Sequence, residues 1–521
     1  MEMDIILEAI AAFCFLAIFG LAWRVLDWAL FAPKRLEKRL RQQGFKGNPY
    51  RFLVGDVKES GIMLQEAMSK PMEFNNDIVP RLMPYIDKTI KTYGKNSFTW
   101  MGRMPRLHVL EPELFKEVLN HYRKFPKNVS IHNPLIKFLF TGVGSYEGDK
   151  WSKHRKVINP AFTLEKVKNV LPAFAYCYEK ELGKWEQMIS REGLHEVDVF
   201  QAFDVSTSDV ISQVAFGSTY EEARKIFQFI KELVNLTIES MRDVYIPGWR
   251  FLPTKRNNRM KKINKEISDI MRNMISQRIE AMKATGKPTG NDLLSVLLES
   301  NFQEIQKEGN KKNVGLSIDE IIEECKLFYF VGQDTTGVTL TWITLLLCKH
   351  PEWQERAREE VFRTFGRNKP TYDELSHLKY VTMIVHEVLR LYPPAFDLNK
   401  VVYEDTKLGP YTIPAGTQIH LGTIMLHRDK SIWGEDAMEF NPMRFSDGVA
   451  AATKNQVAYI PFSYGPRYCV GQNFALLQLR LAVAMMLQRF SFTLSPYYVH
   501  APFSIISLQP QFGAPVIFRK L

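Results

Sequence analysis

The sequence predicts one membrane-spanning helix near the N-terminus, followed by a single large domain that contains several helices. Three observations lead to this prediction. Residues 9–23 are apolar without interruption. The four residues from Ser317 to Glu320 have the pattern of a helix-capping box and precede a long apolar run. The pair Pro393-Pro394 ends a segment whose charges have helical spacing. No linker of low complexity and no internal repeat divides the chain after residue 50.

The N-terminal apolar segment has the length and the flanking charges of a membrane anchor. Apolar character resumes from residue 25 to 32 around Asp27, and a span of about 20 residues crosses a bilayer. Basic residues between 34 and 41 follow it, which places the rest of the chain in the cytosol. No basic region precedes the segment, which argues against a cleaved signal peptide. We expect an anchor over 1–33, a basic hinge over 34–50 and the main domain over 51–521.

Composition excludes several classes of protein. The five cysteines are irregularly spaced and form no CxxC pair, which argues against a zinc site and a disulfide framework. The formal net charge is +11, but the basic residues are not interleaved with aromatic ones as in a surface that stacks bases. The sequence therefore favours a reducing, cytosol-facing compartment and excludes nucleic acid as a partner.

A glycine-rich turn surrounds Cys469, in Phe-Ser-Tyr-Gly-Pro-Arg-Tyr-Cys-Val-Gly over 462–471. Gly465 allows a sharp turn where a side chain would collide with a bound group, and Gly471 allows the next helix to begin close to it. Backbone N–H groups near that helix start can hydrogen-bond the sulfur. Arg467 adds a fixed positive charge. This pattern is typical of a cysteine thiolate that ligates haem iron.

The turn resembles the haem-binding signature of the cytochrome P450 superfamily, and the likeness extends over nearly the whole chain. The resemblance implies a mainly α fold with a small β region around a buried haem b, with Cys469 as the axial ligand. Within the long helix, residues 331–336 resemble the family's oxygen-binding groove. The resemblance implies that Gly332 makes room for dioxygen beside a widened helical turn and that Asp334 and Thr335 deliver protons. The alternative is that these residues form a notch for helix packing.

Further motifs of the family fall on residues that hold the haem or support its ligand loop. Trp151 and Arg155 are spaced as one face of a helix and match the pair that reaches a haem propionate. Lys400 stands where an arginine is common, and Arg467 is expected beside a propionate as well. The triad that locks behind the cysteine loop in the family matches Glu387, Arg390 and Arg444.

The resemblance also implies partners. No GxGxxG motif for NADPH or flavin follows a strand, so an external NADPH–cytochrome P450 reductase is expected to supply electrons. The basic cluster from Lys150 to Lys156 is a candidate docking surface for an acidic electron donor. The endoplasmic reticulum membrane is the usual location of anchored enzymes of this family.

The substrate pocket is expected to be apolar with a few polar anchors. His132 either binds a substrate carboxylate or ester, or serves as an ordinary hydrogen-bonding residue of a loop. Asp397 either accepts hydrogen bonds from a hydroxyl-rich substrate such as a glycoside, or caps a local turn. The other candidates for substrate contact are apolar: Val331, Phe396 and Phe503.

The chain resembles the plant 72 family of these enzymes at segments 44–51, 351–356, 500–503 and 509–513. Within that family, segments 397–400 and 431–445 are most similar to enzymes that oxidatively open the cyclopentane ring of the iridoid glucoside loganin. Loganic acid is its carboxylate counterpart. Close relatives hydroxylate 7-deoxyloganic acid, triterpenoids or gibberellins. A haem-thiolate isomerase that needs no reductase and a non-catalytic haem-binding membrane protein would also carry the cysteine loop. The proton-delivering pair, Asp334 and Thr335, argues against the isomerase.

Overall fold

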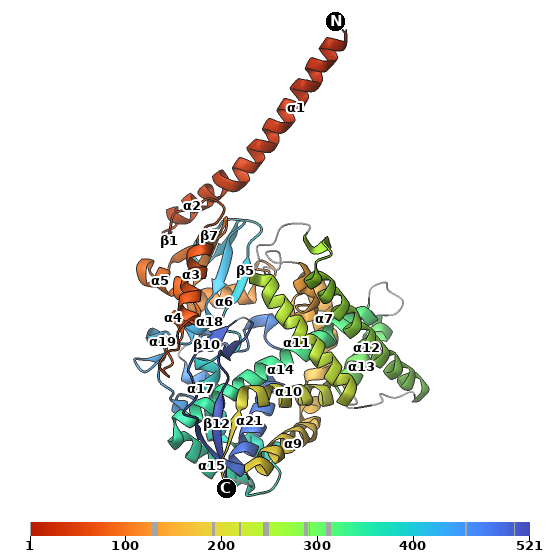
Figure 1. Cartoon of the computed structure of the whole chain (residues 1–521), viewed down its shortest axis with the longest axis vertical. Helices are drawn as coiled ribbons and strands as arrows, with labels where there is room; N and C mark the ends of the chain where they lie inside the picture. The colour runs from red at the N-terminus through yellow and green to blue at the C-terminus, as the bar shows by residue number, and fades with distance from the viewer. Residues whose placement is uncertain are drawn as a thin grey trace. The chain divides into compact units, whose positions relative to one another are not determined.

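The computed structural model describes residues 2–127, 134–189, 193–217, 220–242, 249–285, 290, 292–308, 314–453, 456–504 and 506–521. Two compact units are formed by the chain. Unit 1 contains Met1–Lys70, Asp77–Asn128 and Asp397–Leu426, and unit 2 contains Pro71–Asn76, Val129–Phe396 and His427–Leu521. Each unit consists of helices and small sheets, and helices dominate the chain (Figure 1). The mainly helical fold expected from the sequence is confirmed.

Unit 1 is organised around a five-stranded sheet with the order β1-β2-β3-β8-β5. Neighbours β2–β3 and β5–β8 are antiparallel, whereas β1–β2 and β3–β8 are parallel. The sheet therefore joins segments separated by about 300 residues. The strands of unit 1 are β1 Lys46–Gly47, β2 Ser97–Met101, β3 Met104–Val109, β5 Leu398–Val401, β6 Thr406–Leu408, β7 Tyr411–Ile413 and β8 Gln418–Leu421. Its α-helices are α1 Glu2–Leu26, α2 Ala32–Gln42, α3 Val57–Met68, α4 Val79–Leu82, α5 Pro84–Tyr93, α6 Pro112–Asn120 and α18 Thr423–Leu426.

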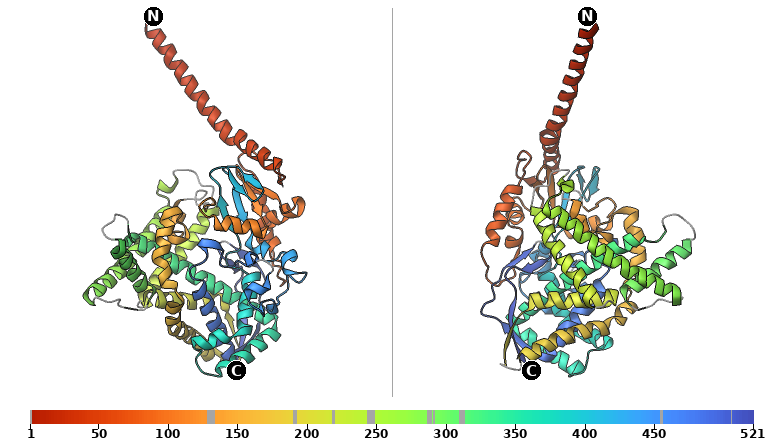
Figure 2. Two further views of the ribbon diagram at one scale, coloured as in Figure 1. Left: turned by 180° about the vertical axis from the view of Figure 1, so that it is seen from behind. Right: turned by 45° about the vertical axis from the view of Figure 1, so that its right-hand side comes forward.

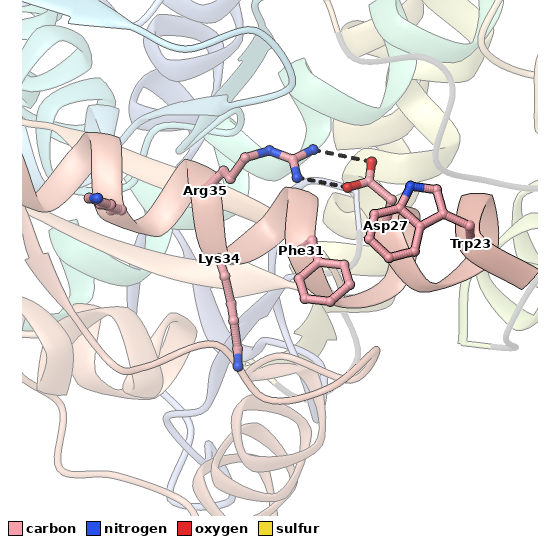
Figure 3. Close-up of a pocket in the computed structure, with 6 residues that line it drawn as sticks. Trp23, Asp27, Phe31, Lys34 and Arg35 are labelled. Atoms are coloured by element: carbon pink, nitrogen blue, oxygen red, sulfur yellow. Dashed lines mark hydrogen bonds and ion pairs between the residues drawn. The ribbon is translucent and has the colours of Figure 1, made fainter.

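The N-terminal helix has the properties of the predicted anchor. In the described part of the chain, one helix, Ile5–Gln42, is long and apolar enough to cross a membrane, and none of its apolar window is buried. Both views of Figure 2 show α1 as one continuous rod. A π-helical turn, η1 Asp27–Phe31, joins α1 to α2. At this junction Arg35 donates two hydrogen bonds, of 2.7 and 3.1 Å, to the Asp27 carboxylate (Figure 3).

Residues 34–50, for which we expected a hinge, are largely regular structure. Helix α2 continues to Gln42, and β1 pairs in parallel with β2. A Cβ atom at Gly47 would lie 2.3 Å from the carbonyl oxygen of Phe98, so this position requires glycine for close backbone approach. The sequence signal that indicated a hinge therefore reflects strand pairing at the edge of a sheet.

Unit 2 is built around the long helix α14, Ile318–Lys349, which is buried over most of its length. Ser317 and Glu320 form the predicted capping box at its start. Helix α10, Val199–Phe216, runs beside α14 (Figure 1). A helix that is apolar on nearly all sides is stable only inside a core, and α14 satisfies this condition.

The remaining elements of unit 2 surround these two helices. Its other α-helices are α7 Gly148–Ile158, α8 Leu164–Asn169, α9 Leu171–Ile189, α11 Tyr220–Arg242, α12 Lys255–Thr285, α13 Leu293–Glu308, α15 Pro351–Phe365, α16 Tyr372–His377, α17 Lys379–Leu391, α19 Lys430–Trp433, α20 Val449–Ala452 and α21 Gln472–Arg489. Its strands form a three-stranded sheet of order β4-β12-β9 and a β10-β11 hairpin: β4 His195–Asp198, β9 Phe490–Leu494, β10 Pro502–Ser504, β11 Leu508–Pro510 and β12 Pro515–Lys520.

Candidate functional site

The loop before α21 has the tight turn that the sequence predicts around Cys469. Gly465 has φ +71°, in the region that favours glycine, and begins a single 3-10 turn, η8 Gly465–Arg467. Ser463 also has a positive φ, +64°. The backbone N–H of Cys469 donates to the carbonyl of Phe462 at 2.8 Å. The chain therefore folds back on itself and presents the cysteine directly before the helix.

The surroundings of the Cys469 sulfur act on it in opposite directions. Burial raises the pKa of this thiol, whereas a hydrogen bond from the backbone N–H of Gly471 and the nearby Arg155 guanidinium lower it. Both of the latter favour a thiolate, which is the form that ligates a metal. Burial also raises the pKa of the other three cysteines outside the N-terminal helix: Cys177, Cys325 and Cys348. Among Cys177, Cys325, Cys348 and Cys469, the pKa of Cys469 is the one that a backbone N–H lowers.

Arg155 and Trp151 lie on α7, and the structure brings this helix against the cysteine loop. Both side chains are buried. One nitrogen of Arg155, Nη1, donates to the carbonyl of Tyr468 at 2.9 Å, and its guanidinium lies 4.7 Å from the centre of the Tyr468 ring. The other nitrogen, Nη2, is buried and has no hydrogen-bond partner within the described residues. A buried cationic donor without a partner is costly, so the arrangement fits an anionic group such as a haem propionate beside Cys469.

Arg467 already has protein partners in this structure. Its guanidinium pairs with the carboxylate of Glu147, donates to the carbonyl of Tyr146 and lies 4.9 Å from the centre of the Trp151 ring. Only 6% of the side chain is exposed. The arginine therefore links the cysteine loop to the segment before α7, and its contact with a propionate remains a prediction.

On α14, Val331 and Thr335 lie one turn apart, and both are more exposed than the buried Gln333 and Thr336. Val331 is 39% exposed although most of the helix is buried. The Thr335 hydroxyl donates to the Val331 carbonyl at 2.8 Å. A hydroxyl bonded back to the helix occupies a fixed rotamer, and this face of α14 therefore presents one apolar and one hydroxyl side chain.

The reason for Gly332 differs from the one that the sequence led us to expect. Residues 331–336 are uninterrupted α-helix, without the widened turn that we predicted. A Cβ atom at Gly332 would lie 2.4 Å from Cδ1 of Ile211 on α10. One turn further, a Cβ at Gly337 would lie 3.1 Å from the Thr207 hydroxyl. These glycines therefore allow α10 and α14 to approach closely.

Asp334 faces a different set of partners from its neighbour Thr335. Gln509, on β11, donates to the Asp334 carboxylate at 3.2 Å and is itself bonded to Ser507 at 3.0 Å. Burial and the carboxylate of Asp204 raise the pKa of Asp334 to about 6, although Ser507 and Gln509 oppose the shift. The group can therefore hold or release a proton near neutral pH. Nothing in the sequence pattern pointed to Gln509 or Ser507, because they lie more than 170 residues from Asp334 and approach it only in the folded chain.

The structure brings Glu387, Arg390 and Arg444 together in the interior of unit 2. Arg390 donates two hydrogen bonds of 2.7 Å to the Glu387 carboxylate, and both side chains are fully buried. Arg444 lies 3.5 Å from the same carboxylate and donates to the carbonyl of Trp433 at 2.8 Å. Met443, next to Arg444 in the chain, is 46% exposed, so its side chain is not needed in this network.

Removing the charge of Glu387 is expected to destabilise the protein strongly. Glu387→Gln leaves two guanidinium groups around a neutral amide in a buried site, and breaking a buried pair costs about 3–5 kcal/mol. We expect a correspondingly lower free energy of unfolding, measured by denaturant titration, and poor haem incorporation. The control is Glu435→Gln, since Glu435 pairs with Lys430 and its own side chain is 90% exposed. This substitution should change the free energy of unfolding by less than about 1 kcal/mol. Equal effects of the two substitutions would contradict the role assigned to the buried triad.

The other predicted site residues are placed as follows. Asp397 and Lys400 belong to unit 1, where Lys400 is buried on β5 and its backbone pairs with Ile419 of β8. Phe396 and Phe503 belong to unit 2 and are partly exposed, and Phe503 is paired with Gln509 across the β10-β11 hairpin. His132 lies outside the described residues.

Comparisons with known proteins show the family to which the chain belongs. The profile of the cytochrome P450 family matches residues 80–504. Secologanin synthase 2 and secologanin synthase 1, both from Catharanthus roseus, are each 70% identical to the chain over 521 residues, which cover 100% of this chain and 99% of theirs. The 7-deoxyloganic acid hydroxylase of the same organism is 53% identical over 500 residues, 96% of each chain. The chain therefore belongs to the cytochrome P450 family.

Proposed function

We propose that this protein is a membrane-anchored haem-thiolate monooxygenase that oxidatively opens the cyclopentane ring of loganin or loganic acid, to give secologanin or secologanic acid. The observation that carries the substrate is the 70% identity, over the whole chain, to two proteins named secologanin synthase. The observation that carries the chemistry is the Cys469 loop, in which the backbone N–H of Gly471 donates a hydrogen bond to the sulfur and the Arg155 guanidinium adds a nearby positive charge. The domain boundaries proposed are 1–33 for the anchor, 34–50 for the connecting segment and 51–521 for the catalytic part.

Cys469 would ligate the haem iron, and four basic or aromatic side chains would hold the propionates: Trp151, Arg155, Lys400 and Arg467. The unpartnered Nη2 of Arg155 supports this assignment, because a propionate would complete its hydrogen bonding. When bound, haem with a thiolate ligand activates dioxygen with two electrons that are delivered singly. The protein must then bind the substrate, exclude water and supply protons.

Asp334 and Thr335 would supply those protons. A carboxyl group whose pKa is about 6 is partly protonated near neutral pH and can therefore donate and be recharged. Its hydrogen bond from Gln509 keeps the carboxylate oriented. Thr335 presents a hydroxyl on the neighbouring position of the helix, held by the Val331 carbonyl. A proton would pass from Asp334 to the site through this hydroxyl or through water.

Electrons would come from an NADPH–cytochrome P450 reductase at the endoplasmic reticulum membrane. The single apolar N-terminal helix in the described residues supports a single-pass anchor. Of the basic cluster on α7, Lys153 pairs with Glu320 and Lys156 pairs with Glu304. Lys150 lies over the ring of Tyr146. Part of the charge that we expected to attract an acidic donor is therefore already neutralised within the protein.

Asp397 is the proposed acceptor for hydroxyl groups of the substrate, and its surroundings in unit 1 support this role. The Nδ1 atoms of His108 and His420 are 3.1 Å apart, and Nε2 of His420 lies 3.7 Å from the Asp397 carboxylate. Burial lowers the pKa of His420 to about 3 and that of His108 well below its usual value, so both rings are neutral. Asn399 donates to the same carboxylate at 3.0 Å.

The neutral side chains of His108, His420 and Asn399 orient the Asp397 carboxylate and add no positive charge beside it. One Nδ1 of the histidine pair must donate and the other accept. If His420 accepts, its Nε2 carries the proton and faces Asp397. The carboxylate side chain is 29% exposed, so it retains the capacity to accept hydrogen bonds from a sugar. Substrate contacts by His132, Val331, Phe396 and Phe503 complete the proposal.

The test is turnover by microsomes that contain the full chain and a plant reductase. We expect NADPH-dependent conversion of loganin or loganic acid to a ring-opened aldehyde, identified by mass spectrometry, and no comparable conversion of 7-deoxyloganic acid. Asp397→Asn should raise KM for the glucoside about tenfold, because one hydrogen bond to a charged group is weakened, and should leave KM for the aglycone unchanged. If the protein instead converts 7-deoxyloganic acid preferentially, it is a hydroxylase of that acid, and the proposed ring opening is wrong. Equal effects of the substitution on glucoside and aglycone would remove Asp397 from the sugar site.

A further inference from the structure

A buried group of charged side chains joins α14 to α7 on the side of the cysteine loop, and the proposed chemistry does not use it. His154 and Glu324 are both fully buried. Nδ1 of His154 lies 2.6 Å from Oε1 of Glu324, and Nε2 lies 3.3 Å from Oε1 of Glu320. Each ring nitrogen therefore faces a carboxylate. Burying charged groups is costly unless they are paired, so this arrangement requires an explanation beyond packing.

The two carboxylates of the group, Glu320 and Glu324, have different hydrogen-bond partners. Glu320 lies at the first turn of α14 and bonds to the Ser317 N–H and to Lys153. Burial alone would raise the pKa of Glu320, but these contacts lower it to about 2. Glu320 thus belongs to the outer edge of the group. Glu324 lies one turn deeper and accepts a hydrogen bond of 2.8 Å from the backbone N–H of Val143.

The segment that contains Val143 fits closely onto Glu324. Gly142 has φ +62°, and a Cβ atom there would lie 2.6 Å from Oε2 of Glu324. Any other residue would be strained by its backbone conformation and would collide with the carboxylate. Further along, Tyr146 packs edge-on against the His154 ring, with the ring centres 4.6 Å apart. Glu324 and His154 thus fix both ends of residues 142–146.

The next part of the same segment holds Arg467. The carbonyl of Tyr146 and the carboxylate of Glu147 both bond its guanidinium, which packs on Trp151. Arg467 is two residues from Cys469 and part of the same turn. A continuous series of contacts therefore runs from the middle of unit 2 to the loop that carries the haem ligand.

We propose that Glu324 and His154 are positioning residues for the haem-ligand loop: they fix residues 142–147, which in turn hold Arg467 and Trp151 beside Cys469. Supporting side chains of this kind around a metal ligand commonly change affinity by about 10–100-fold when they are removed. The inference rests on the haem that family membership implies and is independent of the iridoid substrate.

The test measures the rate of haem loss from the purified, full-length holoenzyme to excess apomyoglobin. Glu324→Gln and Glu147→Gln should each accelerate haem loss about tenfold. In each, the carbon monoxide complex should convert from the thiolate to the thiol form at the same increased rate. Glu320→Gln is the matched control: it changes a carboxylate of the same group whose hydrogen bonds in the described residues go to Ser317, Lys153 and His154. Haem loss in this variant should stay within about twofold of the wild type.

The double variant tests whether Glu324 and Glu147 both act on the haem-ligand loop through residues 142–147. If Glu324 acts through residues 142–147, Glu324→Gln/Glu147→Gln should lose haem no faster than the faster single variant. The proposal would be overturned if Glu324→Gln lost haem at the wild-type rate. It would also be overturned if the increase in rate in the double variant equalled the product of the two single increases. If Glu324→Gln does not accumulate as folded protein, Glu147→Gln decides alone, because its carboxylate is partly exposed: an unchanged rate would overturn the proposal. None of these outcomes depends on turnover of any substrate.

Discussion

Replacing Cys469 with serine should abolish the thiolate-type absorption of the reduced, carbon monoxide-treated protein. Thiolate ligation is what gives this complex its displaced Soret band, and a serine hydroxyl stays protonated at neutral pH and does not replace the sulfur. Monooxygenase activity should fall by more than the roughly 100-fold that removal of an outer-shell partner causes. The measurement is the difference spectrum, together with product formation from loganin or loganic acid.

Cys348→Ala is the matched control for this substitution. Cys348 lies at the end of α14, where burial raises the pKa of its thiol and no hydrogen bond or positive charge lowers it. Its removal should leave the spectrum unchanged. A thiolate-type band that survives in the Cys469 variant, or disappears in the Cys348 variant, would show that the iron ligand has been assigned to the wrong cysteine.

Asp334→Asn should slow turnover and at the same time stabilise the protein at alkaline pH. The carboxyl group is the proposed proton donor, and loss of a positioned acid costs about 10²-fold or more in kcat. NADPH consumption should continue and become uncoupled from product, with release of hydrogen peroxide. Full coupling in this variant would exclude Asp334 from proton delivery.

The stability effect follows from the raised pKa. Burial lifts the pKa of Asp334 from 3.8 to about 6, so the folded state binds the proton more tightly than the unfolded state does. The stabilising contribution is complete below about pH 4, declines as the pH rises through 6 and is absent above it. Asparagine has no such dependence. The variant should therefore be more stable than the wild type by about 3 kcal/mol at pH 8, and the difference should shrink as the pH falls toward 5.

Denaturant titrations at pH 5 and pH 8 measure this difference. Asp319→Asn on the same helix is the control, because that side chain is 77% exposed and pairs with Arg272 at the surface. Its effect should be small and nearly independent of pH. A pH-independent difference between Asp334→Asn and the wild type would show that Asp334 has an ordinary pKa in the folded protein.

Local features of the chain were predictable because neighbouring residues determine them. The capping box at Ser317 and Glu320 forms as predicted, since its two hydrogen bonds span only three residues. The turn at Gly465 has the positive φ that favours glycine. The apolar N-terminal segment forms one helix long enough to span a membrane. In each case the stabilising interactions lie within a few residues or depend on composition alone.

Features that depend on distant contacts were predicted less well. The segment 34–50, expected as a basic hinge, contains the end of α2 and the strand β1, in which Gly47 meets Phe98 across the sheet. Residues 331–336, where we expected a widened turn, are uninterrupted α-helix, and Gly332 accommodates Ile211 of α10. The bond of Arg467 to Glu147, 320 residues away, was not predicted, and its contact with a propionate stays a prediction. Sequence spacing contains no information about partners that meet only after folding.

The amino-acid sequence by itself determined the chemical character of this protein, because a cysteine, two glycines and an arginine within ten residues suffice to identify a thiolate loop for haem. The tertiary structure alone decided how that loop is held. Glu147 and His154 are far from Glu324 in the sequence, and the three become one network only when α7 packs against α14. The same holds for the proton-holding group, since Asp334 acquires a pKa near neutrality only where burial removes its carboxylate from water.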